Sequence, residues 1–206
     1  MKRHHKFRFK ITIQMLAIGL IPLLLVFGLT SYLVFTNTLN DVRTSNMAIV
    51  QGFASTVGQE MSSVESIMTI LAGTEDVQSM DPEEMSLLLG GVVDGYETIS
   101  QIYVMEPSGM QIYKSSGELG DRADRAYFKE AINGRVNYSN VIISGSTGLP
   151  IVVRAVPIVR NGEIVGVIGA SVDLSFLSKM LTNIDLAEES YGFMVDKEGV
   201  VLAHPN

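Results

Sequence analysis

The pattern of apolar and polar positions begins with a long apolar segment near the N-terminus. Residues 11–35, "ITIQMLAIGLIPLLLVFGLTSYLVF", are 25 consecutive residues without a charged side chain. About 20 apolar residues suffice to cross a lipid bilayer as a helix, and the proline and glycines of this segment are tolerated in membrane helices. A cleavable signal peptide would have an apolar core of roughly 7–15 residues followed by a small-residue cleavage site. The length therefore predicts an uncleaved transmembrane helix.

A helical period follows this apolar segment. Its apolar positions alternate between spacings of three and four, which is typical of one face of a long amphipathic helix. The residues of this stripe are Val50, Phe53, Val57, Met61, Val64, Met68 and Leu71. We expect a long exit helix over residues 36–75, whose stripe packs on its own domain and also pairs with a second copy of the chain.

A shorter helix is indicated by its start signals. Asp81 precedes Pro82, and acidic residues follow in the first turn, an order typical of a capped helix N-terminus. Gly90 and Gly91 are expected to weaken the far end of this helix, because glycine is a poor helix former.

After residue 98 the apolar period changes to two, which indicates β-strands. The turn sequence "EPSG" joins the first two strands as a hairpin, and "GSTG" and "RNGE" mark later turns. The expected strands cover residues 99–105, 110–116, 139–144, 149–160 and 163–174. A closing helix is expected over residues 175–186, and two more short strands over residues 191–196 and 199–206.

These elements predict an α+β fold. It consists of a single N-terminal transmembrane helix, a long amphipathic helix, and a five-stranded antiparallel sheet with helices on its face. This combination is typical of a membrane-attached sensor module.

The distribution of charge gives the chain an orientation. Residues 1–10 hold five of the 15 basic residues and no acidic residue, so the positive-inside rule places them in the cytoplasm and residues 36 onward outside. The rest of the chain carries ten basic residues against all 22 acidic ones, a net charge of −12. Such an acidic ectodomain repels phosphate backbones, which excludes nucleic acid as a partner.

The residue types also limit the chemistry. The chain has no cysteine, and its three histidines are His4, His5 and His204, close to the two ends. Thiolate metal sites, disulfide scaffolds, histidine-based zinc sites and catalytic triads are therefore not expected. We predict neither a cofactor nor a metal, and no enzymatic activity. The charged stretch 121–135, "DRADRAYFKEAINGR", is either a solvated helix start or the lip of a binding site.

The segment "DRAYFKEAINGRVNYSNVIISGSTGLPIVVRAVPIVRNGEIVGVIGASVDLSFL" resembles the membrane-distal module of double Cache (dCache) sensor domains. A "D-R-x-[YW]-[FY]" helix start, an "S-x-x-T-G", a "P-[IV]" strand and a "G-x-[IV]-x-G-V" hairpin occur in this order in that family. Its members are mostly methyl-accepting chemotaxis proteins, and others are membrane histidine kinases and diguanylate cyclases. The resemblance implies a PAS-like sheet and signal transduction across the cell (inner) membrane by a homodimer.

The resemblance also implies a domain organisation. The expected parts are a basic cytoplasmic tail (1–10), a transmembrane helix (11–35), an exit helix (36–75), a membrane-distal Cache module (76–185) and the start of a membrane-proximal module (186–206). A full receptor of this kind would complete the second module, cross the membrane again and continue into a signalling region. We therefore expect this chain to be truncated before its signalling region.

A ligand site follows from the same resemblance. In amino-acid-binding members an arginine at the helix start holds the ligand carboxylate, aromatic residues close over the ligand, and carboxylates hold its ammonium group. Arg125, Tyr127, Phe128 and Asp173 match these positions. Ile142 and Ser144 stand where tyrosine and aspartate are usual, so an organic acid or an amine fits as well as an amino acid. Tyr103 and Ser144 complete the predicted site.

Structural roles compete with these assignments. Asp173 could cap the helix that follows it, and Arg125 could form an ion pair in an empty pocket. Tyr103 could belong to the core. Arg122 is expected to be a surface charge, and Arg154 to extend its charged group from the outer face of its strand into water.

The leading hypothesis is an extracytoplasmic small-ligand sensor of a chemotaxis receptor. The input domain of a membrane histidine kinase or diguanylate cyclase is the alternative among sensors. A membrane-anchored structural or dimerisation module without a ligand is the alternative of another class.

Overall fold

A computed structural model describes residues 2–145, 147–183, 191–196, 199 and 201–204. The chain divides into two compact units, residues 1–52 and 53–206, which are described separately. Helix α1 (Lys2–Ala72) supplies most of the first unit and the start of the second.

The first unit carries the apolar segment. Large apolar side chains from Met15 to Phe35 are exposed, and within the described residues α1 is the one helix that is long and apolar enough to cross a membrane. The hydroxyl groups of Thr30 and Thr36 donate hydrogen bonds to the carbonyl oxygens of Val26 (2.7 Å) and Tyr32 (3.0 Å). These polar groups are therefore satisfied inside the helix, as the interior of a bilayer requires.

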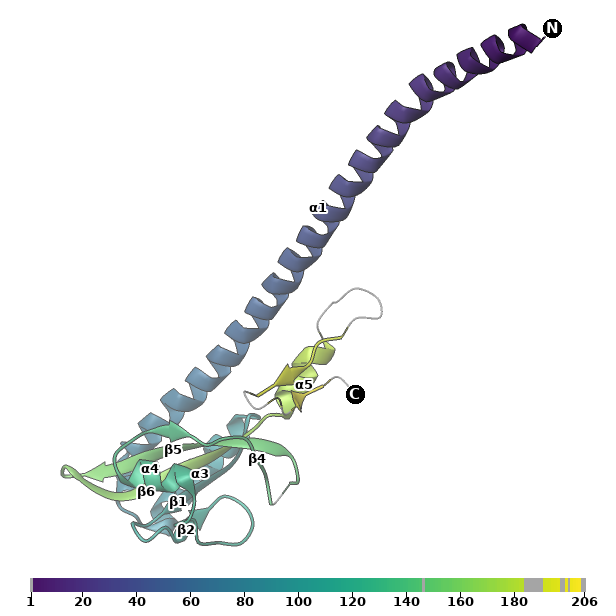
Figure 1. Ribbon diagram of the computed structural model, residues 1–206. Helices are drawn as coiled ribbons and strands as arrows, with labels where there is room; N and C mark the ends of the chain where they lie inside the picture. Colours follow the sequence, from purple (N-terminus) through teal and green to yellow (C-terminus); the bar gives the residue numbers. More distant parts are fainter. Residues whose placement is uncertain (1, 146, 184–190, 197–198, 200, 205–206) are drawn as a thin grey trace. The chain divides into compact units, whose positions relative to one another are not determined.

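The second unit contains an antiparallel sheet (Figure 1). Its strands are β1 (Ile99–Met105), β2 (Gln111–Lys114), β3 (Asn137–Tyr138), β4 (Ile142–Ile143), β5 (Pro150–Arg160) and β6 (Glu163–Asp173). The order is β2-β1-β6-β5-β3, and β4 also pairs with β5. This arrangement confirms the predicted α+β fold with a five-stranded antiparallel sheet behind a long N-terminal helix.

The expected strand over residues 139–144 forms only at Ile142–Ile143 (β4), and a separate strand, β3, precedes it at Asn137–Tyr138. Tyr138 pairs with Arg154 and Ile142 pairs with Ile151, so the three residues between Tyr138 and Ile142 oppose two residues of β5. One extra residue in a strand is a β-bulge, which interrupts the ladder locally. The bulge therefore separates β3 from β4, although both pair with β5.

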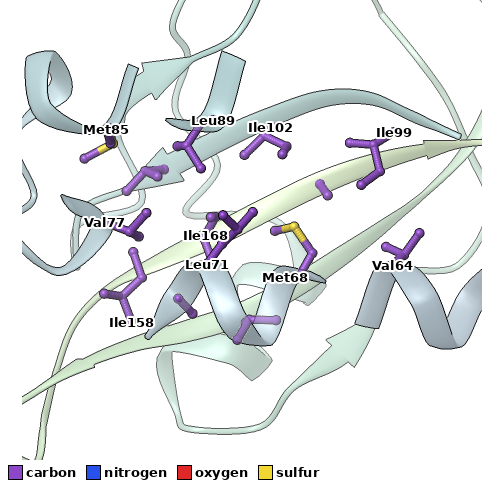
Figure 2. Packing of buried hydrophobic residues seen from close by; sticks show 14 of the residues in the cluster. Val64, Met68, Leu71, Val77, Met85, Leu89, Ile99, Ile102, Ile158 and Ile168 are labelled. Atoms are coloured by element: carbon purple, nitrogen blue, oxygen red, sulfur yellow. The ribbon is translucent and has the colours of Figure 1, made fainter. Parts of the chain in front are cut away.

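One face of the sheet packs against three helices. Figure 2 shows side chains of α1, α2 (Glu75–Gln78) and α3 (Pro82–Gly95) packed with Ile99, Ile102, Ile158 and Ile168 of the strands. Val64, Met68 and Leu71 of the predicted stripe are among the buried residues of this cluster. The packing of the stripe on its own domain is thus confirmed for the C-terminal part of α1.

Helix α3 begins as predicted and extends further than the glycines suggested. The carboxylate of Asp81 accepts a hydrogen bond from the backbone N–H of Glu83 (2.9 Å), so it caps the helix. The helix continues through Gly90 and Gly91 to Gly95. Met85 and Leu89 are fully buried against the sheet, and this packing holds the helix despite the poor intrinsic propensity of glycine.

Arg154 does not extend into water, contrary to the prediction. Its strand turns it toward α1, where the residue is only 5% exposed. One guanidinium nitrogen lies 2.8 Å from a carboxylate oxygen of Glu65, and the guanidinium carbon lies 4.5 Å from the ring centre of Tyr138. The Tyr138 hydroxyl donates to the carbonyl of Met61 (2.9 Å). These polar contacts join β3 and β5 to the helix.

The C-terminal part contains short elements. Helix α5 (Ser175–Thr182) is shorter than the expected closing helix, and residues 184–186 of that expectation lie outside the described residues. Strands β7 (Met194–Val195) and β8 (Val201–Ala203) pair with each other. Residues 200, 205 and 206 of the last expected strand also lie outside the described residues.

We predict that Glu65→Ala lowers the free energy of unfolding by about 1–2 kcal/mol, because it leaves the buried Arg154 guanidinium without its carboxylate. The value is at the lower end for a charged hydrogen bond because the Glu65 side chain is 55% exposed. Denaturant unfolding of the full chain in detergent micelles would measure the difference. Glu60→Ala removes the same charge from the same helix, and an equal loss in both variants would contradict the assignment.

Candidate ligand-binding site

The second face of the sheet holds a cavity of about 470 Å³. Residues of β1, β2, β4, β5 and β6 line it, together with the loop before α4 (Ala126–Ile132) and the start of that helix. The buried residues on this face include Met105, Val153 and Val167, which pack with Phe128 of α4. The cavity therefore lies between a sheet face and the segment that carries the predicted site.

A tyrosine pair lies inside this cavity. Tyr103 is 4% exposed and lies beside Tyr127 and Ser171. Burial, and then the neighbouring Tyr127, raise the pKa of Tyr103 well above its ordinary value, and burial also raises the pKa of Tyr127. Both hydroxyls are therefore neutral at physiological pH and offer hydrogen bonds without adding negative charge.

The Tyr103 ring occupies space left by a glycine. Tyr103 pairs with Gly169 across β1 and β6. A Cβ atom on Gly169 would lie 2.5 Å from the nearest ring carbon of Tyr103. The ring therefore packs over the backbone of β6, which sets the position of its hydroxyl.

A hairpin turn positions the segment before α4. Gly109 has a φ of +95°, and a Cβ atom there would lie 2.5 Å from the Cα atom of Ala123. The backbone N–H of Arg122 donates to the carbonyl of Gly109 (2.8 Å), and the Asp121 carboxylate accepts from the N–H of Ala123 (2.8 Å). The turn and the segment thus lie in direct contact, which places Arg122 beside the end of β2.

Gln111 is the most buried polar side chain of the cavity lining, at 2% exposure. Its Oε1 atom accepts a hydrogen bond from the N–H of Gly120 (2.9 Å). Its Nε2 atom is buried and has no hydrogen-bond partner among the described residues. A buried donor without a partner costs about 1–3 kcal/mol.

The charged residues of the lining are mostly basic. Lys114, Arg122 and Arg125 contribute three positive charges, and Glu118 contributes one negative charge. Arg125 also lies 3.5 Å from Asp124, but both side chains are more than half exposed, so this pair leaves the guanidinium accessible. Arg122, expected to be a surface charge, is partly exposed and also lines the cavity, and its guanidinium donates to the carbonyl of Asp121 (3.0 Å).

The structure brings some of the predicted site residues together. Tyr103, Ser144, Arg125 and Tyr127 all line the cavity. Phe128 is not among the lining residues and is buried in the core under α4. The role of the four lining residues in binding remains a prediction.

Asp173 is also absent from the lining of this cavity. Its carboxylate accepts a hydrogen bond from the N–H of Ser175 (2.8 Å), the first residue of α5. The N-cap position of α5 is Leu174, so this contact ties Asp173 to the start of the helix from one residue before the cap.

Sequence reasoning missed Gln111, Lys114 and Arg122 as cavity residues. In the structure Gln111 pairs with Met105 after a register shift in the hairpin, a shift that the predicted turn did not indicate. For Arg122 no sequence pattern nearby distinguishes a side chain that lines a cavity from a charged side chain in solvent before a helix.

A smaller cavity of about 350 Å³ adjoins the first. The two share Arg125, Tyr127 and Ile142, and the smaller one is also lined by Tyr138. Since Tyr138 hydrogen-bonds to α1, the residues around the cavities are connected to the long helix.

Residues 36–206 match the family model described as dCache_1, a Cache domain. The chain is 29% identical over 87 residues to the methyl-accepting chemotaxis protein PscA of Pseudomonas syringae pv. tomato, in a match that covers 42% of this chain and 14% of that protein. The chain thus spans a small fraction of the length of this relative.

Two solved structures share the fold. The ligand-binding domain of the amino-acid chemoreceptor PctC of Pseudomonas aeruginosa PAO1, in complex with GABA, has a TM-score of 0.60 and 22% identity and covers 75% of this chain and 71% of its own. The sensory domain of the Campylobacter jejuni chemoreceptor Tlp3 with isoleucine bound has a TM-score of 0.64 and 17% identity. This match covers 84% of this chain and 72% of that domain's chain. At these identities the likeness concerns the fold alone.

We predict that Gly169→Ala destabilises the domain by about 1–3 kcal/mol, because the new methyl group overlaps the Tyr103 ring and forces a shift. Thermal unfolding would measure the loss. Gly91→Ala is the matched control: it lies in α3 with open space around its added Cβ atom, and alanine there should stabilise by up to about 1 kcal/mol. Equal effects of the two substitutions would contradict the packing of Tyr103 over Gly169.

Proposed function

The chain belongs to the dCache_1 family of Cache domains, and on this premise we propose that it is the extracytoplasmic ligand sensor of a transmembrane chemotaxis receptor. The observation that carries the proposal is the cavity between the sheet and α4, lined by two tyrosines and three basic side chains. A concave site with a few convergent polar groups is the usual form of a small-molecule site.

The proposed site would bind a ligand carboxylate and surround the ligand with aromatic rings. The Arg125 guanidinium can hold a ligand carboxylate through two parallel hydrogen bonds, a geometry that lysine does not offer. Tyr127 and Tyr103 supply ring surface and neutral hydroxyl groups beside it. The related domains were solved with GABA and with isoleucine, and for this chain the candidate ligands are an amino acid, an amine or an organic acid.

The proposed topology follows from the apolar segment and the charges around it. Residues 1–10 lie in the cytoplasm, residues 11–35 cross the inner membrane, and residues 36–206 lie outside. The exit helix covers residues 36–75 and the membrane-distal module residues 76–185. Residues 186–206 begin a membrane-proximal module.

The proposed signal passes from the cavity to the exit helix. Ligand draws Arg125 and Tyr127 toward the sheet, and the contacts of Tyr138 with Met61 and of Arg154 with Glu65 transmit the movement to α1. The helix between residues 40 and 71 then shifts, and the membrane helix tilts or slides within a homodimer. Such a signal requires that the ligand bind one arrangement more tightly than the other.

Two alternatives give different expectations. The same sensor could serve a membrane histidine kinase or a diguanylate cyclase, and the catalytic activity of the full-length protein would distinguish these outputs. A purely structural module would be stabilised by no small molecule, and Arg125→Ala would leave its stability unchanged or higher.

We predict that at least one small amino acid, amine or organic acid raises the unfolding temperature of the full chain in detergent micelles. Ligand at about 100 times its dissociation constant adds roughly 2.7 kcal/mol of stability. Arg125→Ala should abolish most of this gain, whereas Arg135→Ala should keep it, because Arg135 is not among the residues lining the cavity and pairs with Glu130. A panel that leaves the midpoint unchanged would support the structural alternative.

A further inference from the structure

Taking the proposed sensor function as its basis, we infer that the cavity binds a small dicarboxylate, which the guanidinium groups of Arg122 and Arg125 and the side-chain amide of Gln111 hold. The ligand would therefore be an organic dianion without an ammonium group. Two observations support this assignment: the charges of the lining, and a buried donor of the lining, Gln111 Nε2, that has no partner among the described residues.

The charges of the lining favour a dianion. Three basic side chains and one acidic side chain give a net charge of +2 among the described lining residues. The single carboxylate of this set, that of Glu118, belongs to an exposed residue at the rim. A dicarboxylate neutralises the set, whereas an ammonium group at ordinary contact distance from these cations would be repelled.

The other carboxylates of this region are engaged elsewhere. Asp173 lies outside the lining of the cavity and accepts a hydrogen bond from the N–H of Ser175 at the start of α5. Asp121 accepts from the N–H of Ala123, and Asp124 pairs with Arg125 at the surface. An ammonium group in the cavity would therefore find few partners of opposite charge.

Gln111 supplies a buried hydrogen-bond donor, its side-chain Nε2 atom. Its Oε1 atom accepts a hydrogen bond from the N–H of Gly120, so the amide orientation is fixed and Nε2 is the remaining polar atom of this lining residue. This nitrogen is buried and has no partner among the described residues. A carboxylate oxygen satisfies it, whereas an ammonium group, which only donates, does not.

The hydroxyl groups that line the cavity are also compatible with a dicarboxylate ligand. Tyr103, Tyr127 and Ser171 line the cavity and carry no charge at physiological pH, since burial raises the pKa of both tyrosines. They can donate to a carboxylate or to a hydroxyl substituent of the ligand, and they add no negative charge that would attract an ammonium group.

A series of compounds with four-carbon chains tests the inference, because their charge varies while their length is kept. Isothermal titration calorimetry of the full chain in nonionic detergent would use succinate, aspartate, 4-aminobutyrate and 1,4-diaminobutane. We expect succinate to bind at least about tenfold more tightly than aspartate, 4-aminobutyrate to bind more weakly still, and 1,4-diaminobutane not to bind. Succinate binding should weaken as salt is added.

Variants connect the affinity to the named residues. Arg122→Ala should weaken succinate binding about ten- to a hundredfold, and Arg135→Ala should leave it unchanged. Gln111→Glu keeps the acceptor for Gly120 and replaces the donor by a carboxylate oxygen, so it should weaken succinate binding at least about tenfold. Glu118→Gln should strengthen it, because it removes a negative charge from the rim.

The outcomes separate the inference from the proposed function. If aspartate or 4-aminobutyrate binds more tightly than succinate, the dianion inference is wrong and the sensor function stands. If succinate binds but neither Arg122→Ala nor Gln111→Glu weakens it, the assigned site is wrong. If the folded wild-type chain binds none of these compounds, the dianion inference fails, and a silent wider panel of amino acids and amines would then overturn the sensor function as well. Circular dichroism checks the folding of each variant, and Arg122→Ala decides the site should Gln111→Glu not fold.

Discussion

The alternation of side chains along the central strands β1 and β6 is the constraint on which the rest of the domain depends. Ile102 and Val104 pack in the core against the helices. Tyr103 and Met105, which alternate with them along β1, lie on the opposite face of the sheet. Because the period is two, a register slip of one residue would exchange the core and cavity faces. The long pairing of β1 with β6 prevents such a slip and so keeps Tyr103 in the cavity.

Two close approaches then build the cavity on this face. Tyr103 packs over Gly169, and the backbone of Ala123 packs against Gly109. Each approach needs a residue without a side chain, and together they bring α4 and its preceding loop beside the polar ends of the strands. The opposite face binds the long helix through a buried apolar cluster and through the Arg154–Glu65 pair. One sheet thus contacts both the candidate ligand site and the helix that would carry the signal.

Local signals explain what could be predicted from the sequence. Strand periods, turn residues and the Asp81 cap each depend on neighbours within a few positions, so the order of elements and the α+β class could be inferred. The partners of Arg154 and Gln111 come from distant or irregular segments, Glu65 on α1 and the backbone of Gly120. No local sequence pattern encodes those contacts. The burial of the Arg154 and Gln111 side chains therefore could not be predicted from the sequence and is known only from the structure.

The contact that decides between these ligands is a hydrogen bond from the side-chain amide nitrogen of Gln111 to a ligand carboxylate. Two-dimensional ¹H–¹⁵N NMR of the full chain in detergent micelles can follow the side-chain amide signals during a titration with succinate, and the spectrum of Gln111→Glu assigns the signal of Gln111. The account predicts that this signal moves with saturation, whereas that of Gln59 on α1, exposed and outside the cavity lining, does not. A saturable response elsewhere in the spectrum with an unmoved Gln111 signal would contradict it.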